Sequence, residues 1–98
     1  MKIIKKTNGA SLEIALEGRL DTMTAPELEA ELSKSLDGIS DLTLDFSALE
    51  YISSAGLRVL LSSHKAMMSK GGMKIVHVND VVQEVFEVTG FSDILTIE

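Results

Sequence analysis

The sequence has no cysteine and only one proline. Without cysteine, disulfide bonds, thiolate metal sites and cysteine nucleophiles are excluded, and nothing requires an oxidising compartment. The charged N-terminus is not followed by an apolar run of signal-peptide length, and no segment approaches the roughly 20 apolar residues that cross a bilayer. The sequence therefore predicts a cytoplasmic protein without membrane insertion.

Aromatic residues and positive charge are also scarce. Only 4% of the residues are aromatic, and the formal net charge is −6 with a pI near 4.8. Nucleic-acid binding depends on clustered lysine and arginine, and single-strand binders add aromatic side chains on which bases stack. We therefore expect a protein partner and no nucleic acid.

What the chain does contain is enough apolar material for a core. Hydrophobic residues make up 45% of its 98 residues, and no repeat, linker or low-complexity tract interrupts them. A chain of this length buries most of its apolar surface without a covalent staple. The sequence predicts one globular domain over residues 1–98.

Apolar residues follow two different periods along the chain. Alternation of apolar and polar residues predicts strands at residues 2–7, 11–17, 41–46, 73–78 and 94–97, with Asn8-Gly9 as a hairpin turn. Helices are predicted between Thr24 and Gly38, over residues 55–70, and from Asn79 or Asp80 to Gly90. This order predicts an α/β fold with a mixed sheet, and the alternation within strands predicts helices mainly on one face.

The helix patterns also predict which residues are buried. In the first helix, Thr24 precedes Glu27 by three residues, the spacing of a capping box, and the residues on one face are Ala25, Leu28, Leu32 and Leu36. In the last helix, the residues expected in the core are Val81, Val82, Val85, Phe86 and Val88.

No recognisable active site is present. A nucleophilic serine needs a base within hydrogen-bond reach, and the histidines are His64 and His77. Ser54 and His64 lie on one predicted helix, roughly 15 Å apart at about 1.5 Å per residue. His64 falls on an apolar arc with Leu57, Leu60, Leu61 and Met68, so we expect a hydrogen-bonded core or interface residue. The sequence predicts a non-enzyme with no catalytic, cofactor or metal residues.

The most informative segment is the pair Ser53-Ser54 at the start of the second predicted helix. The first turn of a helix has N–H groups without intrahelical partners and the positive end of a dipole, so a serine there makes a good cap. The same position accepts an anion, and a phosphate on Ser54 would add about 1.5 to 2 negative charges there. Capping and phosphorylation both remain open on these grounds.

Three segments carry a recognisable pattern: residues 44–61 around the serine pair, residues 16–21 with Gly18-Arg19-Leu20-Asp21, and residues 85–91. They resemble, in turn, the signature around a phosphorylated serine, the strand ending in a Gly-x-Leu-Asp loop, and the closing helix and turn of the STAS domain family, specifically the bacterial anti-sigma factor antagonists. The resemblance covers nearly the entire chain. It implies a STAS-like domain that binds an anti-sigma factor when unphosphorylated and so releases a sigma factor, which regulates transcription.

The resemblance also implies roles for individual residues and partners. Ser54 is the implied phosphoacceptor, with Ser53 as the alternative, since Ser53 stands where many members have aspartate. The kinase is the anti-sigma factor, and a separate serine phosphatase removes the phosphate. Asp21 matches the loop aspartate that lies beside the acceptor, and the implied partner-binding residues are Asp21, Ser53, Ser54, Gly56 and Leu57. Arg58 joins them from its place on the helix face beside Ser54, although Asp21 and Arg58 also fit a loop residue and a solvated helix face. The rival hypothesis is a STAS scaffold subunit that is never phosphorylated, for example of a lipid-transport ATPase.

Overall fold

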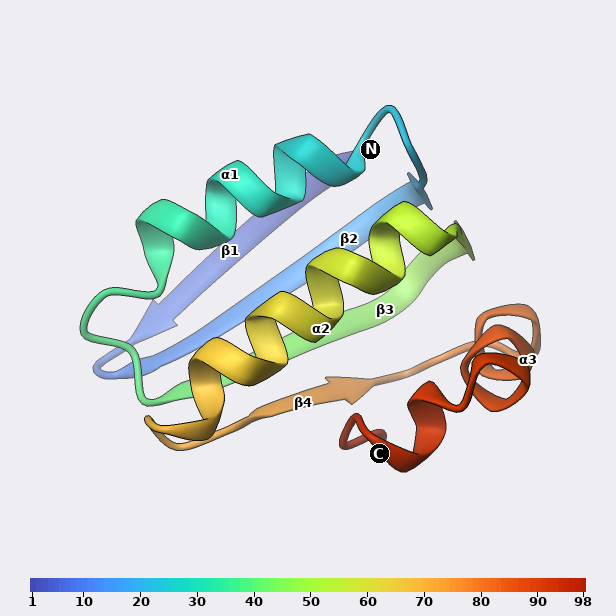
Figure 1. The fold of residues 1–98 in the computed structure, drawn as a ribbon. Helices are drawn as coiled ribbons and strands as arrows, with labels where there is room; N and C mark the ends of the chain where they lie inside the picture. Colours follow the sequence, from blue (N-terminus) through green and yellow to red (C-terminus); the bar gives the residue numbers. More distant parts are fainter.

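Four strands form one sheet in the computed structural model, which describes residues 1–98 (Figure 1). The strands are β1 (Lys2–Asn8), β2 (Ser11–Leu20), β3 (Asp41–Ile52) and β4 (Met73–Val76). They lie in the order β1-β2-β3-β4; β1 is antiparallel to β2, and the other neighbours are parallel. The predicted mixed sheet is confirmed.

Of the three α-helices, two lie along one face of this sheet and the third packs beside the ends of two strands (Figure 1). They are α1 (Ala25–Ser35), α2 (Ser54–Met68) and α3 (Asp80–Thr89), followed by a short 3-10 helix, η1 (Phe91–Asp93). Figure 1 shows α1 and α2 running side by side along the sheet, with α3 beside the ends of β3 and β4. The core lies between the two layers, and the rings of Phe46 in β3 and Phe86 in α3 meet there with centroids 6.5 Å apart. Helices on one face were predicted, and the structure agrees.

The two edges of the sheet differ. β1 is an outer strand; Lys2 and Lys6 are exposed on it, and Lys5 pairs with Glu31 of α1. At the other edge, the C-terminal residues pair with β4 through Ile75 N–H to Thr96 O (2.9 Å) and Glu98 N–H to Ile75 O (2.8 Å). The prediction of a fifth strand over residues 94–97 is wrong in extent, because only Ile97 forms a bridge.

β2 and β3 are longer than the alternation predicted. Residues 47–52 had been expected to form a loop, but they continue β3 to Ile52. The pairing with β2 shifts register between Ala15 and Glu17 and again between Gly18 and Arg19. Such bulges interrupt the simple alternation of buried and exposed residues, so the pattern no longer identifies a strand. The longer strands carry the chain up to the first residues of α2.

A close backbone contact joins the end of α2 to the start of β3. A Cβ atom placed on Gly71 would lie 1.9 Å from the backbone oxygen of Ser40. Ser40 itself donates its N–H to Ala10 O at 2.8 Å, and Leu42 donates to Gly72 O at 3.2 Å. Only glycine fits at position 71 without moving one of these segments.

Some apolar helix residues face solvent, contrary to the sequence prediction. Val82 and Phe86 of α3 are fully buried, but Val81 is 56% exposed and Val88 is 80% exposed. Residues four apart share a helix face, so Val82 and Phe86 define the core side and the other two valines lie off it. Met68, placed by the sequence on the apolar arc of α2, is likewise 71% exposed.

Candidate functional site

The start of α2 and the loop after β2 emerge together at one end of the sheet. Leu20, the last residue of β2, pairs with Ile52, the last residue of β3. Ser53 donates its backbone N–H to Leu20 O at 2.9 Å, which fixes this exit. Since the two parallel strands end side by side, the loop beginning at Asp21 lies next to the first turn of α2. The expectation that Asp21 and Ser54 occupy neighbouring segments is confirmed.

The two serines occupy different environments. Ser53 is the N-cap residue of α2 with extended backbone (φ −103°, ψ 175°), but its side chain makes no cap hydrogen bond. Its Oγ atom is buried and has no hydrogen-bond partner. Ser54 is the first residue of the helix and is exposed. An enzyme approaching from solvent therefore meets the Ser54 hydroxyl and not that of Ser53.

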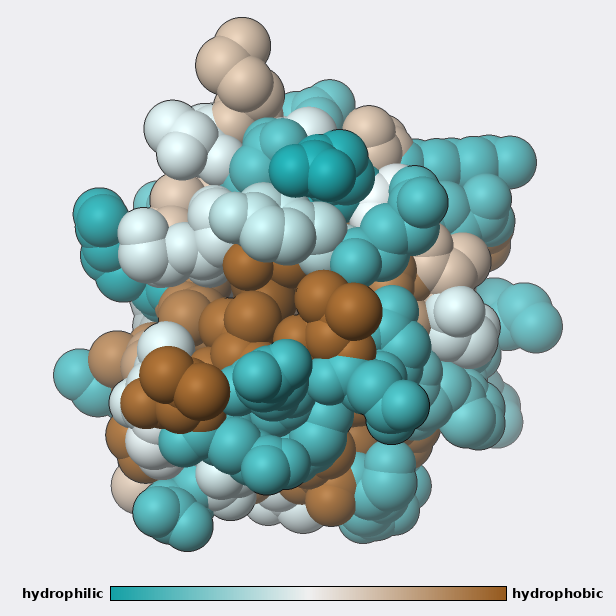
Figure 2. Space-filling model, turned by 90° about the vertical axis from the view of Figure 1, so that its right-hand side faces the viewer, coloured by the Kyte–Doolittle hydropathy of each residue, from teal (hydrophilic) through white to brown (hydrophobic).

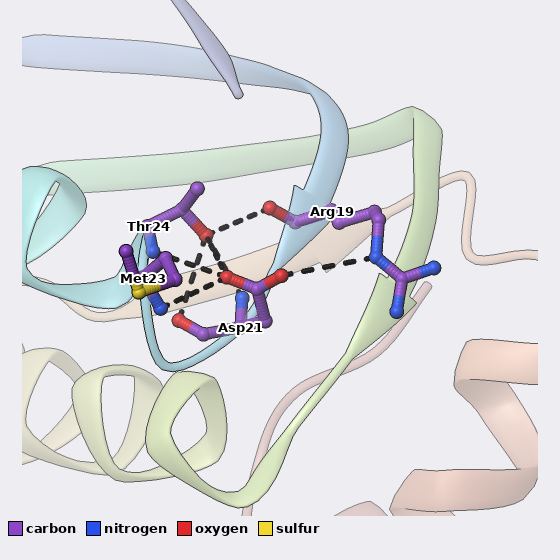
Figure 3. Close-up of polar contacts among 4 residues, drawn as sticks. All are labelled: Arg19, Asp21, Met23 and Thr24. Carbon is purple, nitrogen blue, oxygen red and sulfur yellow. Dashed lines mark hydrogen bonds and ion pairs between the residues drawn. The ribbon is translucent and has the colours of Figure 1, made fainter.

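The Asp21 carboxylate organises its loop (Figure 3). Its Oδ1 atom accepts hydrogen bonds from the backbone N–H groups of Met23 (3.0 Å) and Thr24 (3.1 Å). The Thr24 hydroxyl turns back along the chain, donating to Arg19 O and accepting from the Asp21 N–H, both at 2.8 Å. The predicted capping box is wrong, because this hydroxyl closes the loop and makes no cap hydrogen bond to α1.

Arg19 completes the loop on its other side. Its Nε atom lies 3.8 Å from Asp21 Oδ2, and its guanidinium stacks 4.4 Å from the centre of the Tyr51 ring. Burial raises the pKa of the Asp21 carboxyl. Hydrogen bonds from Thr24 and Met23 and the charge of Arg19 together outweigh this effect, so the pKa lies below its ordinary value of 3.8. Asp21 is thus held as a carboxylate that stiffens the loop.

We expect the chemical shifts of the Met23 and Thr24 amides to report the titration of Asp21. Because the folded-state pKa is below the unfolded value, the carboxylate stabilises the fold above the unfolded pKa, and this contribution is lost as pH falls through the folded-state pKa. In a pH titration followed by NMR, both amides should shift with a midpoint below 3.8. Asp21→Asn should abolish this transition, and a midpoint at or above the ordinary value would contradict the proposed bonding.

A groove runs from the Asp21 loop between the first turns of α1 and α2. Its volume is about 280 Å³, and its lining residues are Thr22, Ala25, Pro26, Glu29, Ala55, Arg58, Val59 and Ser62. Arg58 is exposed and forms no ion pair. It follows Ser54 by four residues, so the two side chains share one face of α2. The groove therefore ends beside an exposed hydroxyl and a free guanidinium.

Two of the expected contact residues lie inside the domain. Leu57 is only 5% exposed, and Gly56 is buried against β2, where an added Cβ would lie 2.7 Å from Leu20 Cγ. The side chain of Leu57 packs into the core, and its expected role in partner binding stays a prediction. Both residues support the position of α2 on the sheet.

Met23 is a surface feature that the sequence did not single out. It is 84% exposed at the tip of the Asp21 loop, beside the start of α2. A methionine between two threonines carries no distinctive signal, because only the fold of the loop turns it outward. Flexible, polarisable methionine side chains suit protein contacts.

His64 does not form a catalytic pair with Ser54. No hydrogen bond joins the two side chains. His64 lies ten residues after Ser54 along α2 and is partly buried, as predicted. The expectation that its ring is hydrogen-bonded is wrong for one atom, since Nδ1 is buried without a partner. No three histidine, aspartate or glutamate side chains are grouped closely enough to hold a metal ion, and no helix is long and apolar enough to span a membrane.

Known proteins share both the sequence pattern and the fold. The family model described as "Mlab, STAS domain" matches residues 4–96. BtrV of Bordetella bronchiseptica, which carries a provisional name as an anti-sigma factor antagonist, is 36% identical over 99% of this chain and 85% of its own length. The anti-sigma-B factor antagonist of Bacillus subtilis is 27% identical over 94% of this chain and 85% of its own.

The fold also matches that of a solved structure, the Bacillus cell fate determinant SpoIIAA in its phosphorylated form. The TM-score is 0.76 at 16% identity, over 99% of this chain and 91% of the other. At this identity the match supports the fold alone, whereas the family model and the relatives support the family. Members of this family act as non-enzymatic regulators, in agreement with the expectation of a non-enzyme. The chain belongs to the STAS domain family of anti-sigma factor antagonists.

Proposed function

We propose that this protein is a cytoplasmic anti-sigma factor antagonist that is switched by phosphorylation of Ser54. In the unphosphorylated form it binds an anti-sigma factor and so frees a sigma factor for transcription. The anti-sigma factor is also the serine kinase that inactivates it, and a serine phosphatase restores it. The chain itself performs no chemistry and needs no cofactor.

The observation that carries this proposal is the first turn of α2, which is exposed and has no negative side chain near the positive end of the helix dipole. α1 has Glu27 in its first turn, and α3 has Asp80 there together with a side-chain cap from Asn79. α2 has neither an acidic residue in its first turn nor a side-chain cap. The positive end of its dipole is therefore available to a phosphate on Ser54, which would be accepted without unfolding the helix.

The proposed contact surface surrounds this hydroxyl. It consists of Ser54 and Arg58 on α2 together with Asp21 and Met23 on the adjoining loop, with Ser53, Gly56 and Leu57 fixing the helix beneath. A neutral Ser54 leaves this surface free to meet a partner. A phosphate there would place a large charge in the interface, where an unpaired, desolvated charge is costly.

The relatives support both the phosphate and the partner in this proposal. SpoIIAA, which shares the fold, is described in a phosphorylated form, and the Bacillus subtilis relative is named for antagonism of the anti-sigma-B factor. A protein with the same fold is therefore compatible with an added phosphate.

The proposal is tested by kinase assay and site mapping. The purified chain is incubated with ATP and each candidate anti-sigma factor kinase of its genome, and phosphopeptides are mapped by mass spectrometry. We expect one phosphate, on Ser54, and none on the Ser54→Ala variant. Ser53→Ala is the matched control, because it removes the buried hydroxyl and should leave phosphorylation intact.

Two outcomes would contradict the proposal. Phosphate only on Ser53 would move the switch to the neighbouring residue. Absence of phosphate with every candidate kinase, while the chain co-purifies with a transport ATPase, would identify the rival scaffold subunit.

A further inference from the structure

The exposed valines of α3 form a row on one side of that helix. Val81 is 56% exposed, Val88 is 80% exposed, and Val85 between them is partly buried. Spaced at i, i+4 and i+7, they share one helix face. Val82 and Phe86 on the core side are fully buried and Val85 packs partly against the core, so Val81 and Val88 are not needed to complete it. The three valines are here called the valine row.

Negative charge is concentrated around the valine row. Residues 1–74 contain ten acidic and nine basic residues, whereas residues 75–98 contain five acidic residues and no lysine or arginine. The five are exposed: Asp80, Glu84, Glu87, Asp93 and Glu98. Of these, only Glu98 has a cation within 4.0 Å, namely Lys74. Nearly all of the net charge of −6 therefore belongs to the segment that carries the valine row.

The acidic residues of α3 lie beside the row and away from the core. At 3.6 residues per turn, Glu84 projects about 60° from the middle of the valine row, on the side opposite Phe86, with Asp80 and Glu87 further round. Figure 2 views the side of the molecule where α3 and the start of α2 lie, and it shows an apolar area at the centre bordered by hydrophilic residues. An apolar strip with an acidic flank is thus presented to solvent.

The helix that carries the row is firmly held. The Asn79 side chain donates to Leu49 O of β3 at 2.8 Å and accepts from the Val82 N–H at 2.8 Å, which ties the start of α3 to the sheet. At the other end Gly90 closes the helix in the left-handed conformation (φ 80°). A surface on a fixed helix pays little ordering entropy when a partner binds.

We infer that the valine row is a docking site for a basic amphipathic helix of a protein partner. Such a helix covers the valines with its apolar face and places its lysines or arginines against the acidic flank. A second copy of this chain would bring two segments of the same negative charge together, and an anionic membrane would repel the same carboxylates. The inference does not depend on Ser54, which lies on another helix.

The test uses a defined probe and the full chain. The probe is a synthetic amphipathic helical peptide with leucines on one face and lysines flanking them, titrated into isotope-labelled protein and followed by NMR. We expect the amide shifts to concentrate on α3 and binding to weaken as salt screens the charges. A peptide with glutamate in place of each lysine should not bind detectably.

Variants of the chain separate the contribution of the valines to peptide binding from that of the acidic residues. Val81→Ser with Val88→Ser should weaken binding at least tenfold, which is about 1.4 kcal/mol. Glu84→Gln with Glu87→Gln should weaken it several-fold and flatten the salt dependence. Met68→Ser, which changes an exposed apolar residue at the end of α2, is the matched control and should leave peptide binding unchanged.

Three results would overturn the inference. If the glutamate peptide bound as well as the lysine peptide, charge complementarity would be ruled out. If the amide shifts mapped outside α3, the valine row would not be the docking site. A concentration-dependent dimer that disappears in the double-valine variant would assign the row to a second copy. Because the peptide titration contains no kinase and no anti-sigma factor, a failure here is distinguishable from a failure of the phosphorylation switch.

Discussion

Replacing Ser54 with aspartate is expected to weaken binding of the anti-sigma factor at least about tenfold while the domain remains folded, a loss of about 1.4 kcal/mol or more. Ser54 is exposed at the first position of α2, where the helix dipole favours a carboxylate by about 0.3–1 kcal/mol, so the fold should not suffer. In the complex the same carboxylate would be desolvated, which typically costs several kcal/mol when it finds no partner.

Ser54→Ala should behave in the opposite way. Ser54 is the first residue of α2 and not its N-cap, and the helix has no side-chain cap hydrogen bond that alanine at position 54 could remove. This variant should bind the anti-sigma factor as the wild type does and should resist inactivation by ATP. Isothermal titration calorimetry with the purified anti-sigma factor measures both variants.

A second aspartate serves as the control for net charge. Ser69→Asp adds the same charge at the opposite end of α2, next to its last residue Met68. It should leave affinity for the anti-sigma factor within about twofold, corresponding to the small effects of exposed charges outside an interface. If Ser54→Asp and Ser54→Ala bind equally, or if Ser69→Asp weakens binding as much, Ser54 is not the switch.

Gly71→Ala is expected to destabilise the protein strongly, although position 71 is itself exposed. The added methyl group would lie 1.9 Å from the backbone oxygen of Ser40, and a backbone atom cannot move aside as a flexible side chain can. Overpacking of this kind costs about 3 kcal/mol. For a domain of this size that corresponds to a loss of roughly 12 °C or more in Tm, measurable by differential scanning calorimetry.

The control for Gly71→Ala is Ser69→Ala, an exposed position two residues earlier. It should keep the Tm within about 2–3 °C of the wild type, as exposed substitutions usually do. A similarly small effect for Gly71→Ala would mean that the contact with Ser40 can open without strain. The segments around Ala10, Ser40 and Gly72 would then be less tightly joined than their hydrogen bonds indicate.

The main helices and strands were predictable because their periods are strong. Ala25, Leu28 and Leu32 were expected on one face of α1, and all three are buried. The end of α3 was placed at Gly90, where the left-handed backbone favours glycine. Local sequence determines such features, so no knowledge of the rest of the fold was needed.

The errors arose where neighbouring segments decide the outcome. Val81 and Val88 were expected in the core because valine is apolar, but the fully buried residues of α3 are Val82 and Phe86, with Val85 partly buried beside them. Thr24 had the spacing of a capping box, yet its hydroxyl bonds to Arg19 O because the chain folds back through the Asp21 loop. Residues 47–52 were expected to be a loop because bulges against β2 hide the alternation.

The placement of the candidate residues was predictable, but their exposure was not. The family resemblance placed Asp21 on a loop beside Ser54, and the structure agrees, because β2 and β3 are parallel neighbours that end side by side. Exposure was not predictable: Leu57 turned out to be buried, and Met23 turned out to be the most exposed of the large apolar residues. Which side chain reaches solvent depends on the angle at which α2 and the loop meet the sheet.

The two edges of the sheet have a consequence for the solubility of the protein. An unpaired edge strand is a template for strand-to-strand aggregation, and lysines along it discourage such pairing. β1 carries Lys2, Lys5 and Lys6, while the edge of β4 is occupied by the backbone of Thr96, Ile97 and Glu98. The first and the last residues of the chain thus protect opposite edges, and a chain shortened before Thr96 would expose β4 to association with other molecules.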